Sequence, residues 1–304
     1  MPIGIIIKGI GGFYYVKADE KLYECKARGI FRKNAVIPLP GDKVVISVND
    51  EEEKLGNLDE ILPRSSELVR PAVANINQIV IVISIKSPQP DIILLDKLLI
   101  TAELKELKAV VCINKIDLDI ENEAKRICDS YSKAGFEVYI TSSNLKQGFE
   151  EIRGIFKDRI TVFAGQSGVG KSTILNTITD SLAMETGEVS KRLDRGKHTT
   201  RHAELIELKS GGYIVDTPGF SSFELDEIAF DKLENYYPEF NAYINKCRFT
   251  WCSHIKEPDC VVKEALEKGD IDRGRYERYI QFYTELKSNK EYRSKDAKIK
   301  KGSA

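Results

Sequence analysis

The sequence contains no apolar run near the ~20 residues that a membrane-spanning helix needs, and its start lacks the basic and long apolar stretches of a signal peptide. Cysteine is scarce, because six cysteines among 304 residues are too few for a disulfide scaffold. Neither sign of charge dominates, with 46 Lys and Arg against 47 Asp and Glu. We therefore expect a cytoplasmic protein without membrane contact. A uniformly basic nucleic-acid binder is excluded, although a basic patch on one face is not.

Residues 1–65 carry short strand patterns separated by turn residues, as in a small closed β-barrel. Five such strands favour an oligonucleotide/oligosaccharide-binding (OB) fold that contacts RNA; the alternative is a barrel that merely packs on its neighbour. The stretch 63–71 is expected to be a linker. The expected strands are residues 3–8, 12–17, 22–27, 43–48 and 56–62.

Residues 66–223 alternate apolar strand patterns with helical ones, which predicts a doubly wound α/β domain. The expected strands are residues 79–85, 109–113, 137–141, 160–164 and 213–215, with 203–208 as an edge strand. Helices are expected at residues 91–107, from an acidic N-cap, and at 121–134.

Residues 224–304 form a third, mainly helical part, with helices expected at 261–268 and 271–288. Its last stretch, 273–304, holds ten Lys and Arg against four Asp and Glu. Such a local excess of positive charge suits contact with an anionic partner.

A glycine-rich segment with the full G-x-x-x-x-G-K-S pattern follows the expected strand 160–164 and opens a helix. Its backbone N–H groups can cradle phosphates, Lys171 can reach the β- and γ-phosphates, and Ser172 can ligate Mg²⁺. The expected phosphate-binding residues are Gly165, Gln166, Ser167, Gly168, Val169, Gly170, Lys171, Ser172 and Thr173.

Two further motifs follow other strands of the domain. In the D-T-P-G motif, Asp216 can hold Mg²⁺ through water, and the N–H of Gly219 can meet the γ-phosphate. In the N-K-x-D motif (Asn114, Lys115, Ile116 and Asp117), the carboxylate of Asp117 can accept two hydrogen bonds from guanine, which adenine cannot offer. Ser142 and Ser143, after the next strand, can close over the base.

These motifs name a GTPase, but N-K-x-D precedes the glycine-rich loop here, whereas most GTPases have the reverse order. A circular permutation explains that order. The sequence resembles the RsgA family of bacterial ribosome-dependent GTPases over essentially its whole length. The resemblance implies an OB-fold barrel, a permuted GTPase domain and a zinc-binding C-terminal domain. It also implies a role in late maturation of the small ribosomal subunit, which stimulates GTP hydrolysis.

A cysteine and histidine cluster lies in the third part. Three thiolates and one imidazole fit a closed, structural zinc site; three buried cysteines and a surface histidine are the alternative. The RsgA resemblance matches all four ligands, which are Cys247, Cys252, His254 and Cys260. We expect Cys25, Cys112 and Cys128 to be small buried apolar residues.

The loop 191–201, between two nucleotide motifs, holds five Lys and Arg against one Asp, so it is either an RNA contact or a solvated loop. It contains Thr200, the expected switch threonine that reaches Mg²⁺. Phe220 stands where Ras-like enzymes have a water-positioning Gln, so another residue must orient the water. His198 is the candidate; the alternative is an ordinary loop histidine.

The sequence therefore predicts a monomeric GTPase that hydrolyses GTP to GDP with Mg²⁺ on the small ribosomal subunit and contacts its rRNA. One alternative is an RNA-binding scaffold that uses GTP only as a conformational ligand. A P-loop kinase is disfavoured by the N-K-x-D motif. Because the core strands are complete by Asp216, we also expect residues 217–223 to link the γ-phosphate to the zinc module.

Overall fold

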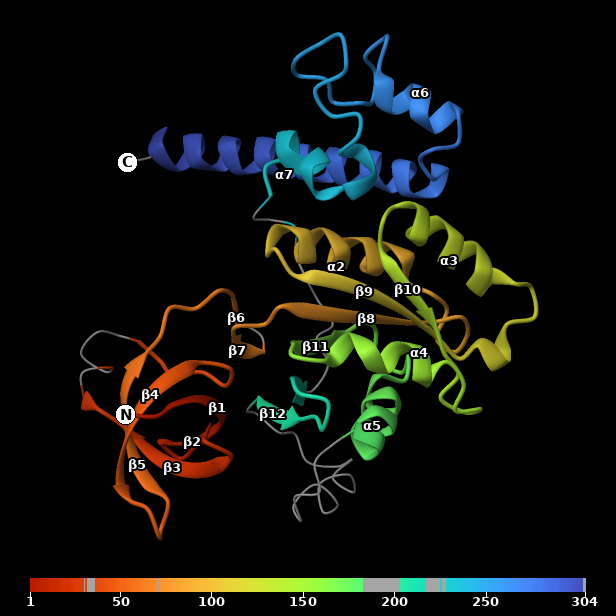
Figure 1. The fold of residues 1–304 in the computed structure, drawn as a ribbon. Helices are drawn as coiled ribbons and strands as arrows, with labels where there is room; N and C mark the ends of the chain where they lie inside the picture. Colours follow the sequence, from red (N-terminus) through yellow and green to blue (C-terminus); the bar gives the residue numbers. More distant parts are fainter. Residues whose placement is uncertain are drawn as a thin grey trace.

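Three groups of elements follow one another along the chain: a barrel, an α/β domain and a C-terminal module (Figure 1). The computed structural model describes residues 1–29, 31, 36–69, 71–182, 203–216, 225 and 228–302, with only the backbone for 180–182 and 291–302. The predicted three-part architecture is confirmed. The boundaries after residues 65 and 223 stay a prediction.

The barrel has five strands, as the sequence predicts. They are β1 (Ile3–Ile10), β2 (Phe13–Ala18), β3 (Lys21–Ala27), β4 (Lys43–Asp50) and β5 (Leu55–Ile61). Pairings of β1 with β4 and of β3 with β5 close the sheet on itself. Alternate side chains point inward, because successive residues of a strand face opposite sides, and Val16, Cys25 and Ile46 are among those that fill the core.

The segment after the barrel is not a plain linker, so that prediction is wrong. Strand β6 (Glu67–Val69) pairs antiparallel with β7 (Ala72–Ala74). Leu68 and Val73 bury their side chains in the core of the α/β domain, which is why so short a hairpin is stable here. Arg64 donates from Nε to the buried Asp42 carboxylate at 2.7 Å and fixes the hairpin to the barrel.

The α/β domain is built on a parallel sheet. Its strands are β8 (Gln78–Ser84), β9 (Lys108–Asn114), β10 (Glu137–Ile140), β11 (Ile160–Ala164), β12 (Glu204–Glu207) and β13 (Tyr213–Asp216), in the spatial order β10-β9-β8-β11-β13-β12. All but β12 run parallel. Every residue of β8 is buried, as expected of a strand covered on both faces.

Helices cover both faces of this sheet (Figure 1). They are α2 (Ile92–Leu104) and α3 (Glu123–Lys133) on one face, and α4 (Phe149–Arg153) and α5 (Lys171–Leu182) on the other, with short 3₁₀ turns at Ile116–Leu118 and Gly154–Phe156. The acidic N-cap of α2 is confirmed, because the Asp91 carboxylate accepts a hydrogen bond from the N–H of Leu94 at 2.9 Å.

The sequence predicts that β12 is an edge strand, but in the structure β12 lies between β13 and strand β1 of the barrel. Besides its partner β13, it is paired with β1 through Lys8 and Glu204, so the two sheets form one sheet of eleven strands. Lys17 of the barrel also reaches Glu207 of β12 at 2.5 Å. Covering β12 removes an exposed strand edge, which is a common site of aggregation.

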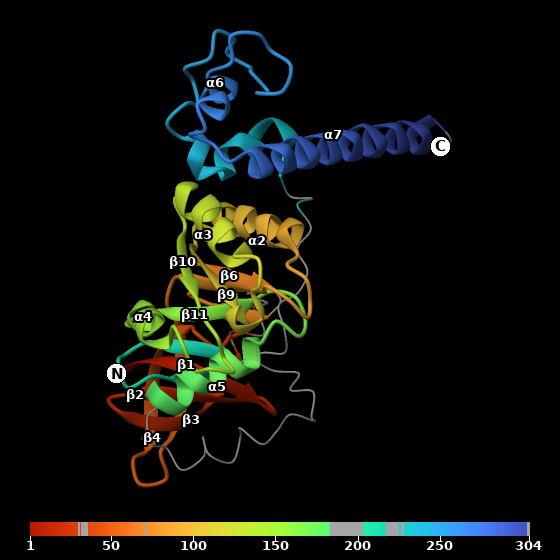
Figure 2. The ribbon, with the colours of Figure 1, turned by 90° about the vertical axis from the view of Figure 1, so that its right-hand side faces the viewer.

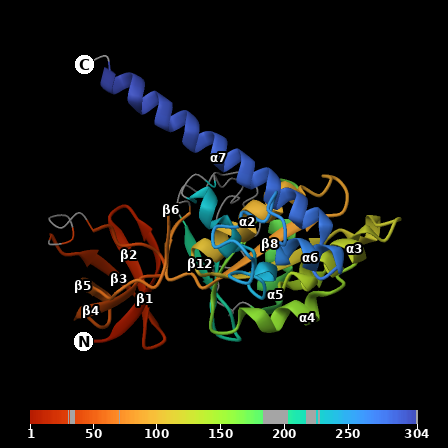
Figure 3. The same ribbon diagram turned by 90° about the horizontal axis from the view of Figure 1, so that it is seen from above.

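The C-terminal module consists of helical segments around an apolar cluster. They are the 3₁₀ segments η4 (Phe230–Tyr236) and η5 (Pro238–Phe240), α6 (Val261–Glu267) and α7 (Arg273–Gly302). Helix α7 runs well past the predicted end at residue 288, because no Gly or Pro lies between Gly274 and Gly302. Its C-terminal half projects away from the other elements (Figures 2 and 3). None of the helices among the described residues is long and apolar enough for a bilayer crossing.

A buried ion-pair cluster joins α7 to α2. Asp96 of α2 is fully buried and accepts hydrogen bonds from Arg275 at 2.6 Å, from Arg278, and from the Tyr131 hydroxyl at 2.7 Å. Arg275 is itself 1% exposed and also donates to Glu239 of η5. The two arginines and two carboxylates balance, so the charges are buried without an excess of either sign.

Removing Asp96 is expected to weaken this joint strongly. Asp96→Ala leaves two guanidinium groups without their shared partner, and breaking a buried ion pair costs about 3–5 kcal/mol. Urea unfolding followed by circular dichroism would show a lower midpoint. Arg273→Ala, at an exposed arginine in the first turn of the same helix, is the control and should leave the midpoint unchanged. Equal midpoints for wild type and Asp96→Ala would contradict the role given to the ion pairs.

Candidate functional site

The predicted nucleotide motifs meet at one edge of the parallel sheet. Strands β9, β10, β11 and β13 end at Asn114, Ile140, Ala164 and Asp216, and a motif follows or ends each of them. Because these strands are parallel neighbours or near neighbours, their carboxyl ends lie along the same edge. Ligands of open α/β sheets bind at such an edge.

The glycine-rich loop requires glycine at two positions. Gly165 has φ +131°, and a Cβ there would lie 2.1 Å from the carbonyl oxygen of Val82. Gly170 has φ +101°, and its Cβ would lie 2.3 Å from Nδ2 of Asn114. Lys171, the first residue of α5, curls back and donates from Nζ to the carbonyl oxygens of Gly165 and Gln166 at 2.6 and 2.7 Å. Burial lowers the pKa of this ammonium group.

Asn114 connects three of the motifs through one buried side chain. Its Nδ2 donates to the carbonyl oxygen of Val169 in the glycine-rich loop at 2.9 Å. Its Oδ1 accepts from the backbone N–H of Ser143 at 3.1 Å and from the Thr141 hydroxyl at 3.2 Å. The side chain is 0% exposed, so these bonds are made away from water and each would be costly to leave unmade.

Of the remaining residues of the N-K-x-D motif, Ile116 packs against the core, whereas Lys115 and Asp117 bond to neighbouring loops. Lys115 donates from Nζ to the carbonyl oxygen of Gly168 at 2.7 Å and to that of Ser87. Asp117 is exposed and accepts a hydrogen bond from the Ser142 hydroxyl at 2.5 Å. This bond is the main cause of a lowered pKa for the Asp117 carboxyl, so the side chain stays an anionic acceptor. The structure thus brings Asp117 and Ser142 together, as a guanine site would require.

The predicted magnesium residues are only partly described. Ser172 is exposed in the first turn of α5, and Asp216 ends β13, the strand next to β11. Their hydroxyl and carboxylate oxygens are of the type that Mg²⁺ prefers. Thr200, His198 and Gly219 lie outside the described residues, as do the loop 191–201 and Phe220.

The four predicted metal ligands converge in the C-terminal module. The ligand atoms of Cys247, Cys252, His254 and Cys260 all lie within 4.8 Å of one another. Nδ1 of His254 is 3.4 Å from Sγ of Cys260 and 3.6 Å from Sγ of Cys247. A zinc ion about 2.3 Å from sulfur and about 2.0 Å from nitrogen separates its ligand atoms by about 3.5–3.8 Å, so the separations of His254 from Cys247 and Cys260 fit the ion.

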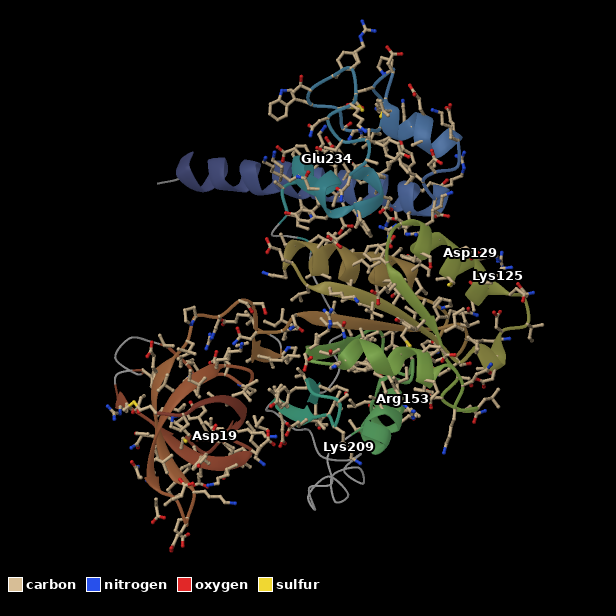
Figure 4. The ribbon with its side chains drawn as sticks, in the orientation of Figure 1. Asp19, Lys125, Asp129, Arg153, Lys209 and Glu234 are labelled. Carbon is tan, nitrogen blue, oxygen red and sulfur yellow. The ribbon has the colours of Figure 1, made fainter. Side chains whose placement is uncertain are left out.

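Glu234 fixes the orientation of the histidine in this cluster. Its carboxylate lies 2.6 Å from Nε2 of His254, on the far side of the ring from the thiols. Nδ1 therefore faces the cysteines. Such a carboxylate behind a histidine ligand is common at zinc centres. Figure 4 labels Glu234 in η4, which lies against α7.

Family models match both the barrel and the α/β domain. The RsgA GTPase model matches residues 61–226, and the RsgA N-terminal domain model matches residues 3–55. A small ribosomal subunit biogenesis GTPase RsgA from Ruminiclostridium cellulolyticum is 60% identical over 97% of each chain. The chain belongs to the RsgA GTPase family. A second RsgA, from Alkaliphilus metalliredigens, is 46% identical over 96% of this chain and 100% of its own.

Two solved structures share the fold over nearly the whole chain. YjeQ from Thermotoga maritima is 34% identical, with a TM-score of 0.81 over 94% of this chain and 98% of its own. YloQ, a circularly permuted GTPase, is 39% identical, with a TM-score of 0.81 over 95% of this chain and 96% of its own. The permuted order read from the motifs is therefore confirmed.

Sequence reasoning missed three residues that support the RsgA sites. Ser87 offers its carbonyl oxygen to Lys115, and Asn144 donates to Asp117 at 3.4 Å. Glu234 supports His254 from twenty residues upstream. Asn144 could have been found, since it directly follows Ser142 and Ser143, which are predicted to close over the base. The other two act across long separations in sequence and carry no local pattern.

We expect Asp117→Asn to change the base preference of this RsgA-family chain. An amide cannot accept both hydrogen bonds from guanine, so GTP affinity should fall by about a hundredfold. Affinity for xanthosine triphosphate should rise, because its C2 carbonyl accepts from an amide. Titration calorimetry with both nucleotides measures the exchange.

Asp119→Asn makes the same chemical change two residues away and is the matched control. Asp119 accepts hydrogen bonds from the N–H groups of Glu123 and Ala124 at the start of α3, one on each carboxylate oxygen at 3.0 Å, and Asn can keep one of the two. The control should bind GTP like the wild type. If Asp117→Asn also bound GTP like the wild type, Asp117 would not read the base.

Proposed function

We propose that the chain hydrolyses GTP to GDP in a Mg²⁺-dependent reaction during the biogenesis of the small ribosomal subunit. The observation that carries the proposal is the hydrogen-bonded cluster around Asn114, which joins motifs from both halves of a permuted domain. The ribosomal role is supported by the curated relatives, which are named small ribosomal subunit biogenesis GTPases.

The proposed residue roles follow from the sequence motifs and, for the described residues, from their place at the edge of the sheet. Asp117 reads guanine, and Lys171 with the surrounding N–H groups holds the phosphates. Ser172, Thr200 and Asp216 are proposed to hold Mg²⁺, which would neutralise charge on the β- and γ-phosphate oxygens. His198 is proposed to position the attacking water, because Phe220 offers no hydrogen bond.

The proposed partners are the small ribosomal subunit and its rRNA. Stimulation of hydrolysis by the subunit is part of the proposal, as are a monomeric state and a cytoplasmic location. RNA contacts are assigned to the barrel of residues 1–65 and the module of residues 224–304, which flank the GTPase domain of residues 66–223. The excess of Lys and Arg in residues 273–304 supports the second contact.

The four-ligand cluster is proposed to hold one structural zinc ion. Three thiolates and an imidazole leave no open coordination position, so the ion supplies folding free energy rather than catalysis.

Serine substitutions test the metal site. Cys247→Ser, Cys252→Ser or Cys260→Ser should each lower the zinc content per chain and loosen the C-terminal module. GTP binding should survive, because the α/β domain has its own core. Elemental analysis measures zinc, with Cys128→Ser as a control outside the cluster. Full zinc occupancy in the triple variant would rule out these ligands.

Phosphate release tests the function itself. GTP turnover is measured with purified small subunits, large subunits or bare RNA, and the small subunit alone should accelerate it strongly. A scaffold that uses GTP only as a ligand would release no phosphate under any condition, and that result would reject the proposal.

A substitution of His198 tests its proposed role in positioning the attacking water. His198→Ala should reduce subunit-stimulated turnover while GTP affinity stays nearly unchanged, because the lost contact is made mainly in the transition state. Turnover equal to the wild type would leave His198 without a catalytic role.

A further inference from the structure

Two aromatic side chains are exposed in the short loop between the first two metal ligands. We define the ligand loop as residues 248–251, which connect Cys247 to Cys252. Trp251 is 84% exposed and Phe249 is 44% exposed. Single exposed apolar side chains are common, but two aromatic rings within three residues are a concentrated apolar surface.

The ligand loop is held in a defined shape. Both ends are metal-ligand candidates, and the N–H of Cys252 donates to the carbonyl oxygen of Phe249 at 3.2 Å. Arg248 donates to Asp259 at 2.9 Å, and its guanidinium lies 5.7 Å from the centre of the Phe249 ring. A loop fixed in this way loses little conformational entropy when it binds a partner.

The charge around the loop is positive. Residues 245–256 contain Lys246, Arg248 and Lys256 and no Asp or Glu. The next acidic side chain, Glu257, is turned back onto the loop and accepts hydrogen bonds from the N–H and the hydroxyl of Ser253 at 2.9 and 2.7 Å. Arg248 is paired with Asp259, so an approaching phosphate meets mainly Lys246 and Lys256 beside the rings.

Exposed aromatic rings next to basic side chains are how proteins bind single-stranded nucleic acid, with bases stacked on the rings and phosphates on the charges. We infer that the ligand loop stacks on an unpaired RNA base through Trp251. Phe249 and Arg248 pack beside the stacked Trp251 ring and RNA base, and Lys246 and Lys256 contact the RNA phosphates. The inference rests on the proposed function only in taking RNA as the partner, and it names the chemical feature of the RNA that is bound.

The chain's single tryptophan makes a direct experiment possible. The full-length, metal-loaded protein is titrated with a short single-stranded purine RNA, with the same RNA as a duplex, and with a backbone of the same length without bases. Stacking should quench the emission of Trp251 with the single strand only. Quenching that is equal for all three would indicate charge attraction alone and overturn the inference.

Variants provide an independent readout. With labelled RNA, fluorescence anisotropy should show that Trp251→Ala weakens single-strand binding by about tenfold, whereas Trp251→Phe keeps most of the affinity. Ile120→Ala removes an equally exposed apolar side chain, also 84% exposed, from the GTPase domain and should have no effect. Wild-type affinity in Trp251→Ala would overturn the inference.

Phosphate release separates this inference from the proposed function. If small subunits stimulate the wild type but the RNA titration shows no dependence on bases, stacking is wrong and the function stands. If Trp251→Ala weakens binding to small subunits while its affinity for single-stranded RNA is unchanged, the loop contacts a protein and the inference is overturned.

Discussion

The nucleotide site depends on the buried side chain of Asn114. The hydrogen bonds of its side-chain amide hold the glycine-rich loop through Val169 and the loop that follows β10 through Ser143. It does so from the end of β9, a strand that precedes the glycine-rich loop in the chain. The permutation is therefore compatible with the site, because hydrogen bonds and strand neighbours, rather than chain order, decide which groups meet.

The ion pairs of Asp96 limit how the C-terminal module can respond to the nucleotide. Helix α2 begins at the glycine-rich loop, where Asp91, Gly165 and Gln166 line one small cavity, and it carries Asp96 one turn later. A shift of the module must move α2 with it or break a buried ion pair, at a cost of about 3–5 kcal/mol. Any motion that residues 217–223 transmit to the module, as predicted from the sequence, must therefore also move α2 or break these ion pairs.

The sequence predicted what local patterns encode. The glycine-rich loop, the N-K-x-D turn and the four metal ligands each depend on residue types at fixed spacing, and each group is found together. Features that depend on distant partners could not be predicted. Strand β12 is covered by β1, some two hundred residues earlier, and the hairpin at Leu68 is stable because it packs on another domain. Glu234 likewise can be given a role only once the structure places it beside His254.

The central claim is that the nucleotide site controls binding to the small ribosomal subunit. The most direct test compares the affinity of the protein for small subunits in two nucleotide states. Binding is measured with a non-hydrolysable GTP analogue and with GDP. Affinity should be higher with the analogue, by the roughly 5–150-fold that corresponds to a coupling of about 1–3 kcal/mol. Equal affinities in the two states would contradict a GTP-controlled interaction with the small subunit.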